Sequence, residues 1–585
     1  MTTTGFHTLG AAYFSMEIAL DPAMPTYSGG LGILAGDTLR SAADMGLPMG
    51  AVTLLYRKGY FEQHLDAQGN QTETASEWEP EKLLQALEAR ATITLDGQSL
   101  TIRAWQYTIR GCTGHLVPVY LLDTDLPENS PFARTLTGQL YGGDDHYRLC
   151  QEAVLGIGGV AMLRRLGHHH VLTYHMNEGH PALLAMALLE EHLGGRPCSE
   201  ASAEDIGFIR KKCVFTTHTP VPAGHDRFSE PLVRRVLGDA HTNALEKGGC
   251  MGGNVLNMTD LGLRFSHYIN GVAMQHGEVS RGMFPNYPVR AITNGVHAGT
   301  WTSKPFQELF DRHIPEWRCD NLYFRYAIGI PLFEIRTAHA QAKQMLREEL
   351  LHKTGFQLDP NILTIGFARR AAAYKRADLL FSDLERLKSI AREIGPMQLV
   401  FGGKAHPQDS AGKEQIRHVF EAVAALKGVI NCVYVENYEM RWASLITAGV
   451  DLWLNTPQRP FEASGTSGMK AALNGVPSFS VPDGWWLEGH VEGATGWDIG
   501  REEIPERPAD EIASLYHKLE TIIVPMFYGR PEAYAEVMRL SIALNGAFFN
   551  TQRMLSQYVL DAYFSGRQST PLEQVVVETR HSDAA

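Results

Sequence analysis

The second half of the chain alternates between short apolar runs and amphipathic runs, and this pattern restricts the fold more than any other feature. The runs ILTIGFARR, MQLVFGGKA, VINCVYVENY and VDLWLNTP have the length and composition of buried strands. Helical segments such as ADLLFSDLERLKSIAREIG, KEQIRHVFEAVAALKG and EMRWASLITAG stand between them. Strands and helices that alternate in this way predict a parallel, doubly wound α/β sheet.

The first half predicts a second α/β unit that also contains a hairpin. Apolar residues after Gly32 recur at helical spacing, MGAVTLLY is typical of a buried strand, and ATITLDGQSLTIRAWQYTI predicts a hairpin at its Asp-Gly pair. KKCVFTTHTP and PVRAITNGVH are expected to be strands that end in polar loops. Because TWTSKPFQELFDRHIPEW lacks a sheet pattern, we place a domain boundary there. We therefore expect two Rossmann-like domains, residues 1–300 and 301–585, facing each other across a cleft, with the last helices packing back on the first domain.

Composition excludes several classes of protein. A length of 585 residues is too great for one core and indicates two or more domains. The net charge of -13 disfavours a nucleic-acid partner, because phosphate backbones select basic faces. Neither a signal peptide nor an apolar run long enough for a membrane span is visible, so we expect a soluble cytoplasmic protein without a membrane partner.

Metal and disulfide sites are not expected. The seven cysteines contain no CxxC pair, which disfavours both a disulfide framework and a cysteine zinc site. The HHH run at residues 168–170 resembles a ligand cluster, but successive side chains of an extended segment point to opposite faces. GxxxxGK[ST] and GxGxxG are also absent, so neither a P-loop nor a dinucleotide site is indicated.

Charged and glycine-rich segments follow the expected strands or precede the expected helices. They comprise Arg369, Arg370, Lys375 and Arg376 after ILTIGF, Lys404 after MQLVF, Glu178 and His180 in HMNEGHP, His218 in TTHTP, and Gly29, Gly30 and Gly32 before a helix. Each of these is common in isolation, as a solvated face, a turn or a structural histidine. Because ligands bind at the carboxyl ends of parallel strands, their joint occurrence predicts a site for two anionic groups, such as phosphates.

The segment FEASGTSGMKAALNG places Lys470 one turn into a helix that follows a Gly/Ser/Thr loop. Such a loop can hold an anion on its backbone N–H groups. Lys470 could neutralise a phosphate, or it could form a Schiff base with an aldehyde cofactor such as pyridoxal 5′-phosphate. Spacing alone does not separate these two interpretations.

At these residues the chain resembles the α-glucan phosphorylases, the family of glycogen, starch and maltodextrin phosphorylase. The matching segments run in order through both halves: YSGGLGILAGD, MNEGHP, FTTHTPVPAGH, SHYINGVA, ITNGV, RRAAAYKR, VFGGKAHP, ENYEMRW and EASGTSGMKAALNG. The resemblance implies the two-domain GT-B-type architecture of glycosyltransferases. It also implies reversible phosphorolysis of terminal α-1,4-glucosidic bonds of glycogen or maltodextrin, with retention, to give α-D-glucose 1-phosphate.

The resemblance also implies a role for each matched residue. Lys470 would hold pyridoxal 5′-phosphate, Thr466 and Ser467 would donate backbone N–H groups to its phosphate, and Arg369, Tyr438 and Trp301 would line its pocket. Arg370, Lys375 and the backbone at Gly30 and Leu31 would bind the substrate phosphate, while Glu462, Ser464 and Gly465 would hold sugar hydroxyls. His218 and Asn294 would lie near the sugar O6, with Glu178 and His180 beside the substrate. We take Arg370, Lys375, His218 and Glu462 as the catalytic group.

Departures from the family pattern shape further expectations. The chain starts almost at the catalytic region and is shorter than most members, so we expect neither AMP activation nor control by N-terminal phosphorylation. A homodimer is the expected assembly. Three other functions remain open: a nucleotide-sugar-dependent glucan synthase of the same fold, an inactive glucan-binding protein and a two-carboxylate glycosidase. The Lys470 loop and the phosphate-binding residues argue against all three.

Overall fold

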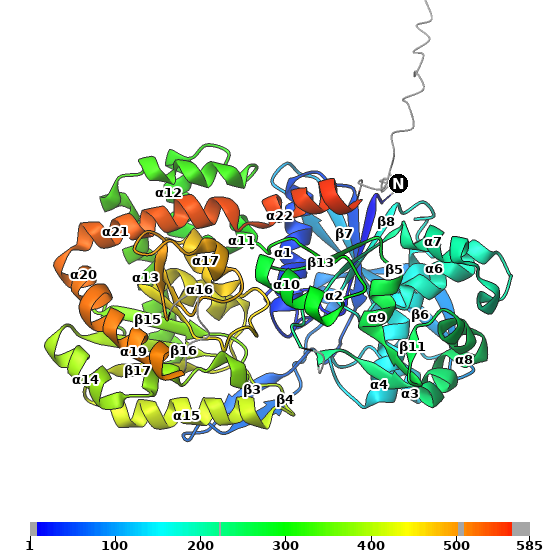
Figure 1. Cartoon of the computed structure of the whole chain (residues 1–585), viewed down its shortest axis with the longest axis horizontal. Helices are drawn as coiled ribbons and strands as arrows, with labels where there is room; N and C mark the ends of the chain where they lie inside the picture. Colours follow the sequence, from blue (N-terminus) through cyan, green and yellow to red (C-terminus); the bar gives the residue numbers. More distant parts are fainter. Residues whose placement is uncertain (1–8, 222–223, 501–507, 564–585) are drawn as a thin grey trace, which may run out of the picture.

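The computed structural model describes residues 9–221, 224–500 and 508–563. It contains two large open sheets that lie in opposite halves of the molecule, with helices around each (Figure 1). The mixed α/β class expected from the sequence is thereby confirmed.

The sheet of the second half has six strands in the order β17-β16-β15-β18-β19-β20, and every neighbouring pair is parallel. The strands are β15 (Leu363–Ala368), β16 (Met397–Gly402), β17 (Asn431–Val435), β18 (Leu452–Asn455), β19 (Ser478–Ser480) and β20 (Gly496–Asp498). Chain order reverses between β15 and β18. A reversal of this kind leaves a crevice at the carboxyl ends of the two strands, where α/β proteins bind ligands.

The sheet of the first half has nine strands in the order β14-β13-β9-β8-β1-β2-β7-β6-β5. They are β1 (Ala11–Ser15), β2 (Met49–Leu54), β5 (Gln85–Leu95), β6 (Gln98–Arg110), β7 (Leu116–Asp123), β8 (Thr173–Asn177), β9 (Cys213–Thr216), β13 (Tyr268–Gly271) and β14 (Arg290–Ala291). The predicted hairpin is confirmed: β5 and β6 are antiparallel, and Asp96 and Gly97 turn with φ of 51° and 70°. Chain order in this sheet reverses between β1 and β8, which are parallel.

The strand expected in PVRAITNGVH is shorter than its apolar character suggests, because β14 contains only two residues. Beyond β14 the chain leaves the sheet and pairs with the C-terminal segment. The N–H of Val296 donates to the Phe549 carbonyl at 3.1 Å, and the N–H of Thr551 donates to the Val296 carbonyl at 3.0 Å. A partner from the far end of the chain thus replaces the neighbouring strand.

Helices cover both sheets. In the first half they are α1 (Gly30–Asp44), α2 (Pro80–Leu83), α3 (Pro131–Thr135), α4 (Asp145–Ala153), α5 (Gly159–Arg165), α6 (Leu184–Leu193), α7 (Ala203–Arg210), α8 (Glu230–Lys247), α9 (Met258–Arg264) and α10 (Met274–Met283). In the second half they are α11 (Ala298–Trp301), α12 (Lys304–His313), α13 (Leu332–Thr354), α14 (Leu384–Glu393), α15 (Ser410–Leu426), α16 (Met440–Gly449), α17 (Ser467–Leu473), α18 (Trp486–Gly489), α19 (Pro508–Lys518), α20 (Val524–Gly529), α21 (Pro531–Leu540) and α22 (Thr551–Gln557). Capping residues define several ends. Asp383 accepts from the N–H of Arg386 at the start of α14, and Gly355 ends α13 with φ of 72°.

Contacts outside the sheets also join the halves. The hairpin of β3 (Glu62–Leu65) and β4 (Gln71–Thr74) reaches the second half, where Gln63 Nε2 donates to the Gly403 carbonyl at 2.9 Å. At the other end of the chain, α22 lies against α1 (Figure 1), with the Ser41 and Thr551 hydroxyls 2.6 Å apart. These contacts tie the two halves of the molecule together.

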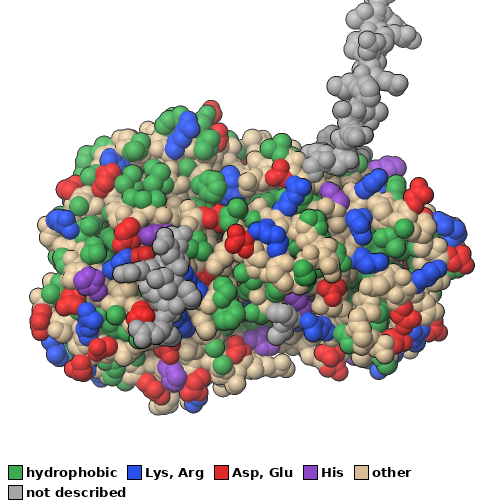
Figure 2. Space-filling model, in the orientation of Figure 1, with side chains coloured by type: hydrophobic (Ala, Val, Ile, Leu, Met, Phe, Trp, Pro, Cys, Tyr) green, Lys and Arg blue, Asp and Glu red, His purple; other side chains and the backbone are tan. Residues whose placement is uncertain are grey.

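The distribution of surface charge and the apolar character of the helices bear on which partners the protein can bind. On the face drawn in Figure 2, acidic and basic side chains of the described residues are interspersed over both halves. Among the same residues, no helix combines the length and the apolar character needed to cross a bilayer.

Candidate functional site

The reversal point of the six-stranded sheet carries a buried cluster of charges. Arg369, directly after β15, donates to Asn455 at the end of β18 and also to the Glu462 carboxylate. Lys375 Nζ donates to both oxygens of Glu462, at 2.8 and 2.6 Å. Burial acts to raise the pKa of Glu462, but the charges of Arg369 and Lys375 outweigh it and lower the pKa to about 2. Glu462 is therefore ionised and held between two cations.

Two further arginines of ARRAAAYKR have different surroundings. Partial desolvation of the Arg370 guanidinium acts to lower its pKa, but Tyr374, Tyr60 and Glu17 raise the pKa above its ordinary value. Tyr60 and Glu17 belong to the first half, so Arg370 faces across to that half. Arg376 instead pairs with Glu511 at 2.5 Å and donates to the Pro457 carbonyl at 2.6 Å, which gives it a structural role.

A second loop holds the FEASGTSG segment in place. The N–H of Glu462 donates to Asp483 Oδ2 at 2.9 Å, and the N–H of Trp485 donates to the Ser464 carbonyl at 2.9 Å. Gly484 has φ of 56°, and a Cβ there would lie 2.5 Å from the Ser464 carbonyl oxygen, so only glycine fits. Burial raises the pKa of Asp483 to about 7; the hydrogen bond from the Glu462 N–H opposes this shift, and the charge of the Glu462 carboxylate adds to it. Gly465 has φ of 81° and lies against the Glu462 side chain.

Lys470 is buried in α17, whose N-terminal turn contains Thr466 and Ser467. Its ammonium nitrogen lies 3.8 Å from the ring centroid of Trp301. The Trp301 indole N–H donates to Asp37 Oδ2 of α1 at 2.7 Å, so the first half fixes this ring. Burial lowers the pKa of Lys470 to about 8, although Asp37 opposes the shift. A buried lysine with a lowered pKa is suited to react with an aldehyde.

Tyr438 follows β17 and lies beside this group. Burial raises its pKa, and Arg369 opposes the change, which places the phenol near that guanidinium. The preceding residue, Asn437, has φ of 53°, and its N–H donates to Gln63 Oε1 at 3.0 Å. The β3–β4 hairpin therefore supports the loop that carries Tyr438.

The reversal point of the nine-stranded sheet holds a glycine loop. Glu17, just after β1, accepts from the N–H of Ser28 at 2.5 Å, the N–H of Gly29 at 3.1 Å and the Tyr141 hydroxyl at 3.0 Å. A Cβ at Gly29 or Gly30 would meet nothing within 4 Å, so open space adjoins the backbone where α1 begins. Leu31 follows in the first turn and is half-buried.

The same reversal point brings together Glu178 and His218. Glu178, directly after β8, accepts from the N–H of His218 at 2.7 Å, while the His218 ring contacts Asn177 Oδ1 at 2.6 Å through Nε2. Burial raises the pKa of Glu178 to about 7 and lowers that of His218 to about 3. At neutral pH His218 is thus uncharged, and one of its ring nitrogens binds Asn177.

Two more predicted site residues, His180 and Asn294, contact Asp226 and Arg553 respectively. His180 Nε2 is 3.5 Å from Asp226 Oδ2, and burial lowers the pKa of His180 to about 4. The backbone of Asn294 is held by Arg553 of α22, whose guanidinium donates to the Asn294 carbonyl at 3.0 Å.

Several predicted site residues carry buried polar atoms that lack a hydrogen-bond partner. Within the described ranges these atoms include His180 Nδ1, Asn294 Oδ1, Arg369 Nε and Ser464 Oγ. Buried polar atoms are rarely left unpaired in native proteins without a reason. Groups that are free to bind a polar ligand therefore occur in both halves.

Sequence reasoning missed four residues that shape this site: Glu17, Asp37, Asp483 and Arg553. Glu17 lies two residues after the end of β1 and Asp483 three residues after the end of β19, so the strand-end argument could have found them. Asp37 is a charged residue among the buried residues of α1, and it is itself fully buried. For Arg553 the sequence holds no comparable signal, because its contact with the Asn294 loop spans 259 positions.

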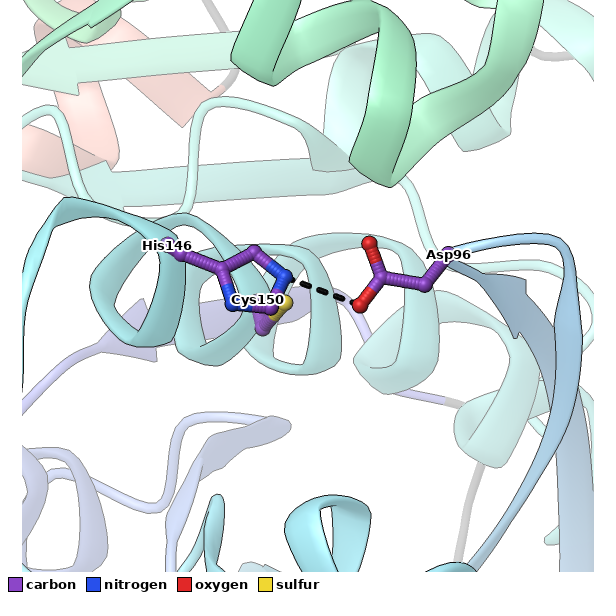
Figure 3. A group of neighbouring side chains, drawn as sticks. All are labelled: Asp96, His146 and Cys150. Atoms are coloured by element: carbon purple, nitrogen blue, oxygen red, sulfur yellow. Dashed lines mark hydrogen bonds and ion pairs between the residues drawn. The ribbon is translucent and has the colours of Figure 1, made fainter.

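Groups of metal-ligand type also occur elsewhere. Figure 3 shows Asp96, His146 and Cys150, in which His146 Nε2 and Asp96 Oδ2 are 2.8 Å apart. Arg235 Nε lies 3.4 Å from the other Asp96 oxygen, so a guanidinium already partly neutralises this carboxylate. In the HHH run, His168 is buried against the Tyr120 hydroxyl at 2.9 Å, whereas residues 169 and 170 are exposed.

Comparison with known proteins confirms the resemblance. A family model described as carbohydrate phosphorylase matches residues 242–492. Maltodextrin phosphorylase of Thermococcus litoralis is 40% identical over 94% of this chain and 70% of its own length. Glycogen phosphorylase of Mycobacterium tuberculosis is 36% identical over 96% of this chain and 71% of its own, and that of Aquifex aeolicus is 31% identical over 94% and 85%. The chain belongs to the carbohydrate phosphorylase family.

Proposed function

We propose that the chain catalyses reversible phosphorolysis of terminal α-1,4-glucosidic bonds in glycogen or maltodextrin, releasing α-D-glucose 1-phosphate with retention. The observation that carries this proposal is the pair of sheet reversal points. One supplies Arg370 and Lys375 for an anion, and the other supplies Glu178, His218 and open glycine backbone for a polar substrate. Membership of the carbohydrate phosphorylase family supports the same reaction.

The two sheets are best understood as two Rossmann-like domains, 1–300 and 301–585, of GT-B type, with the substrate cleft between them. The charge of Glu17 in the first half raises the pKa of Arg370 in the second half. Asp37 of the first half accepts a hydrogen bond from Trp301, which lies beside Lys470. Both relationships support an arrangement in which the two carboxyl edges face one another. The final helices contact the first sheet: the Tyr558 hydroxyl accepts from Asn270 Nδ2 at 2.9 Å.

The residues present fit pyridoxal 5′-phosphate. Lys470 would hold its aldehyde end, because the amine is buried and its pKa is lowered to about 8. Trp301 and Tyr438 supply aromatic surface for the ring, and the unpaired Arg369 Nε and the N–H groups of Thr466 and Ser467 suit its phosphate. When bound, the cofactor would supply a second phosphate that can hold and return a proton.

Arg370 and Lys375 would bind orthophosphate in this reaction. Lys375 now pairs with Glu462, so phosphate binding would have to share or displace that contact. The backbone N–H groups at Gly30 and Leu31 would approach the same anion, since space adjoins them. Two cations and two N–H donors would offset the repulsion between neighbouring phosphates. The phosphate that they hold would in turn place its negative charge beside the positive charge that develops on the sugar.

The glucosyl unit would be oriented by hydrogen bonds from both halves. Asn294 and His218 would bind near O6, and Glu462, Ser464 and Gly465 would bind the remaining hydroxyls. Glu178 and His180 would lie beside the substrate. Bound phosphate would protonate the leaving oxygen and then attack from the same face, which accounts for retention. Closing the halves would exclude water, which would otherwise hydrolyse the sugar.

The test is glucose 1-phosphate release from maltodextrins of graded length, with and without orthophosphate. Release that depends strictly on orthophosphate supports phosphorolysis. Free glucose or maltose formed equally without phosphate would indicate a glycosidase. Chain elongation from a nucleotide sugar, without any from glucose 1-phosphate, would indicate the synthase alternative. A homodimer and a cytoplasmic location stay predictions.

A further inference from the structure

Two cysteines that lie 207 positions apart in the sequence are neighbours in the structure. The sulfur atoms of Cys112 and Cys319 are 3.1 Å apart, and both residues are exposed. Since a disulfide bond is about 2.0 Å long, the two sulfurs need to approach by only about 1 Å. Cysteine spacing had suggested no disulfide framework, because a pair this distant in sequence leaves no local signature.

Both residues are held by their surroundings. Cys112 lies in the turn between β6 and β7, and its N–H donates to Asp44 Oδ1 at the end of α1, at 2.7 Å. Cys319 follows α12, and its N–H donates to the Glu316 carbonyl at 2.8 Å. Gln552 of α22 donates to the carbonyl of the preceding Arg318 at 2.9 Å. The close approach is therefore fixed by hydrogen bonds on both sides.

We propose that Cys112 and Cys319 form a site of reversible covalent modification, becoming an intramolecular disulfide by exchange with a low-molecular-weight disulfide such as oxidised glutathione. One cysteine thiolate attacks the glutathione disulfide, its sulfur–sulfur bond breaks, and one glutathione thiolate leaves. The second cysteine thiolate then attacks the protein sulfur of the mixed disulfide and releases the other glutathione thiolate. The cysteines lose two electrons, glutathione disulfide gains them, and the two thiol protons pass to the departing thiolates.

The exchange should be slow at neutral pH. Partial desolvation, the adjacent Cys319 thiol and Asp44 together raise the pKa of Cys112 to about 12, so its thiolate is scarce. Uncatalysed disulfide rearrangement takes minutes to hours in general, and this site belongs at the slow end. The extent of oxidation must therefore be measured at equilibrium.

The bond would join the first half to the loop after α12 of the second half, close to contacts that position α11 and Trp301. Asp44 accepts the Cys112 N–H and also contacts His297 Nε2 at 2.7 Å, and His297 caps α11, which ends at Trp301. Trp317, just before Cys319, is buried in the core of the second half. A bond that closes so long a loop restricts the unfolded chain, so oxidation should raise the midpoint of thermal unfolding.

The experiment incubates the full-length protein with oxidised glutathione to equilibrium, quenches it by alkylation, and measures intact mass and disulfide-linked peptides. Wild type and the control variant Cys432→Ser should each lose two hydrogens, with the link mapped to residues 112 and 319. Cys112→Ser and Cys319→Ser should not form that link. Dithiothreitol should restore the original mass and reverse the rise in unfolding temperature.

Three outcomes would overturn the proposal. They are a wild-type mass that stays unchanged at equilibrium, a lasting glutathione adduct on either cysteine in place of the internal bond, and a bond mapped to other cysteines. An unfolding midpoint that oxidation leaves unchanged would overturn the inference that the bond restrains the two halves. Because wild-type peptide mapping needs no substitution, these outcomes do not depend on the variants folding.

Discussion

Lys375 Nζ donates to both carboxylate oxygens of Glu462, at 2.8 and 2.6 Å, in a site from which solvent is nearly excluded. Arg369 binds the same carboxylate. Since two cations share one anion here, the cluster has capacity for a further negative charge. The excess positive charge of this cluster can therefore offset the negative charge of a phosphate that binds beside it.

Glu462→Gln should destabilise the protein, because it leaves two buried cations without their anion. Removing one partner of a buried ion pair typically costs about 3–5 kcal/mol of folding free energy. Urea unfolding measures the change. Glu532→Gln is the matched control, since its pair with Arg336 is exposed and should contribute at most about 1 kcal/mol. Equal losses for the two variants would contradict the account of the cluster.

The pH dependence of stability should carry a contribution from Asp483. In the folded protein the pKa of Asp483 is raised to about 7, whereas its ordinary value is 3.8. Between those values the folded state binds more protons than the unfolded state, so stability falls as pH rises from about 4 to 7. Asp483→Asn removes this titration. Urea unfolding at several pH values should therefore show a shallower decline for the variant, and identical slopes would refute the assignment.

Lys470 should be the residue that holds the cofactor. Borohydride reduction followed by peptide mapping should place a pyridoxyl group on Lys470, and Lys470→Ala should lack the cofactor's near-ultraviolet absorption. Lys427→Ala is the control, because that lysine is exposed at the end of α15. A pyridoxyl group on another lysine, or none in the wild-type protein, would remove the basis for the cofactor proposal. Circular dichroism of the Lys470 variant separates loss of cofactor from loss of fold.

Much of the fold could be predicted because local patterns determine it. Strand–helix alternation predicted β15 to β18 and the helices between them, and the Asp-Gly pair predicted the β5–β6 hairpin. The strand-end argument likewise located the charged residues after β15 and β8. Pairings between distant segments had no such signal. The contact of Trp301 with Asp37 and the pairing of Val296, beyond β14, with the C-terminal segment depend on how the two halves meet.

The last prediction separates substrate binding from cofactor binding. Arg370 is exposed, faces Glu17 and Tyr60 of the first half, and can bind a phosphate through two parallel hydrogen bonds. Arg370→Ala should therefore keep the cofactor spectrum and the fold but weaken binding of orthophosphate and glucose 1-phosphate. Loss of one charge-assisted contact in a closed site costs on the order of 2–4 kcal/mol, or roughly 30- to 1,000-fold in kcat/KM for phosphate. Arg370→Lys should recover only part of this, since an ammonium group cannot make the paired contact.

Steady-state kinetics in phosphate at saturating maltodextrin, measured beside the cofactor spectrum, provide the test. Normal phosphate kinetics in Arg370→Ala, or loss of the cofactor instead, would show that the substrate phosphate binds elsewhere.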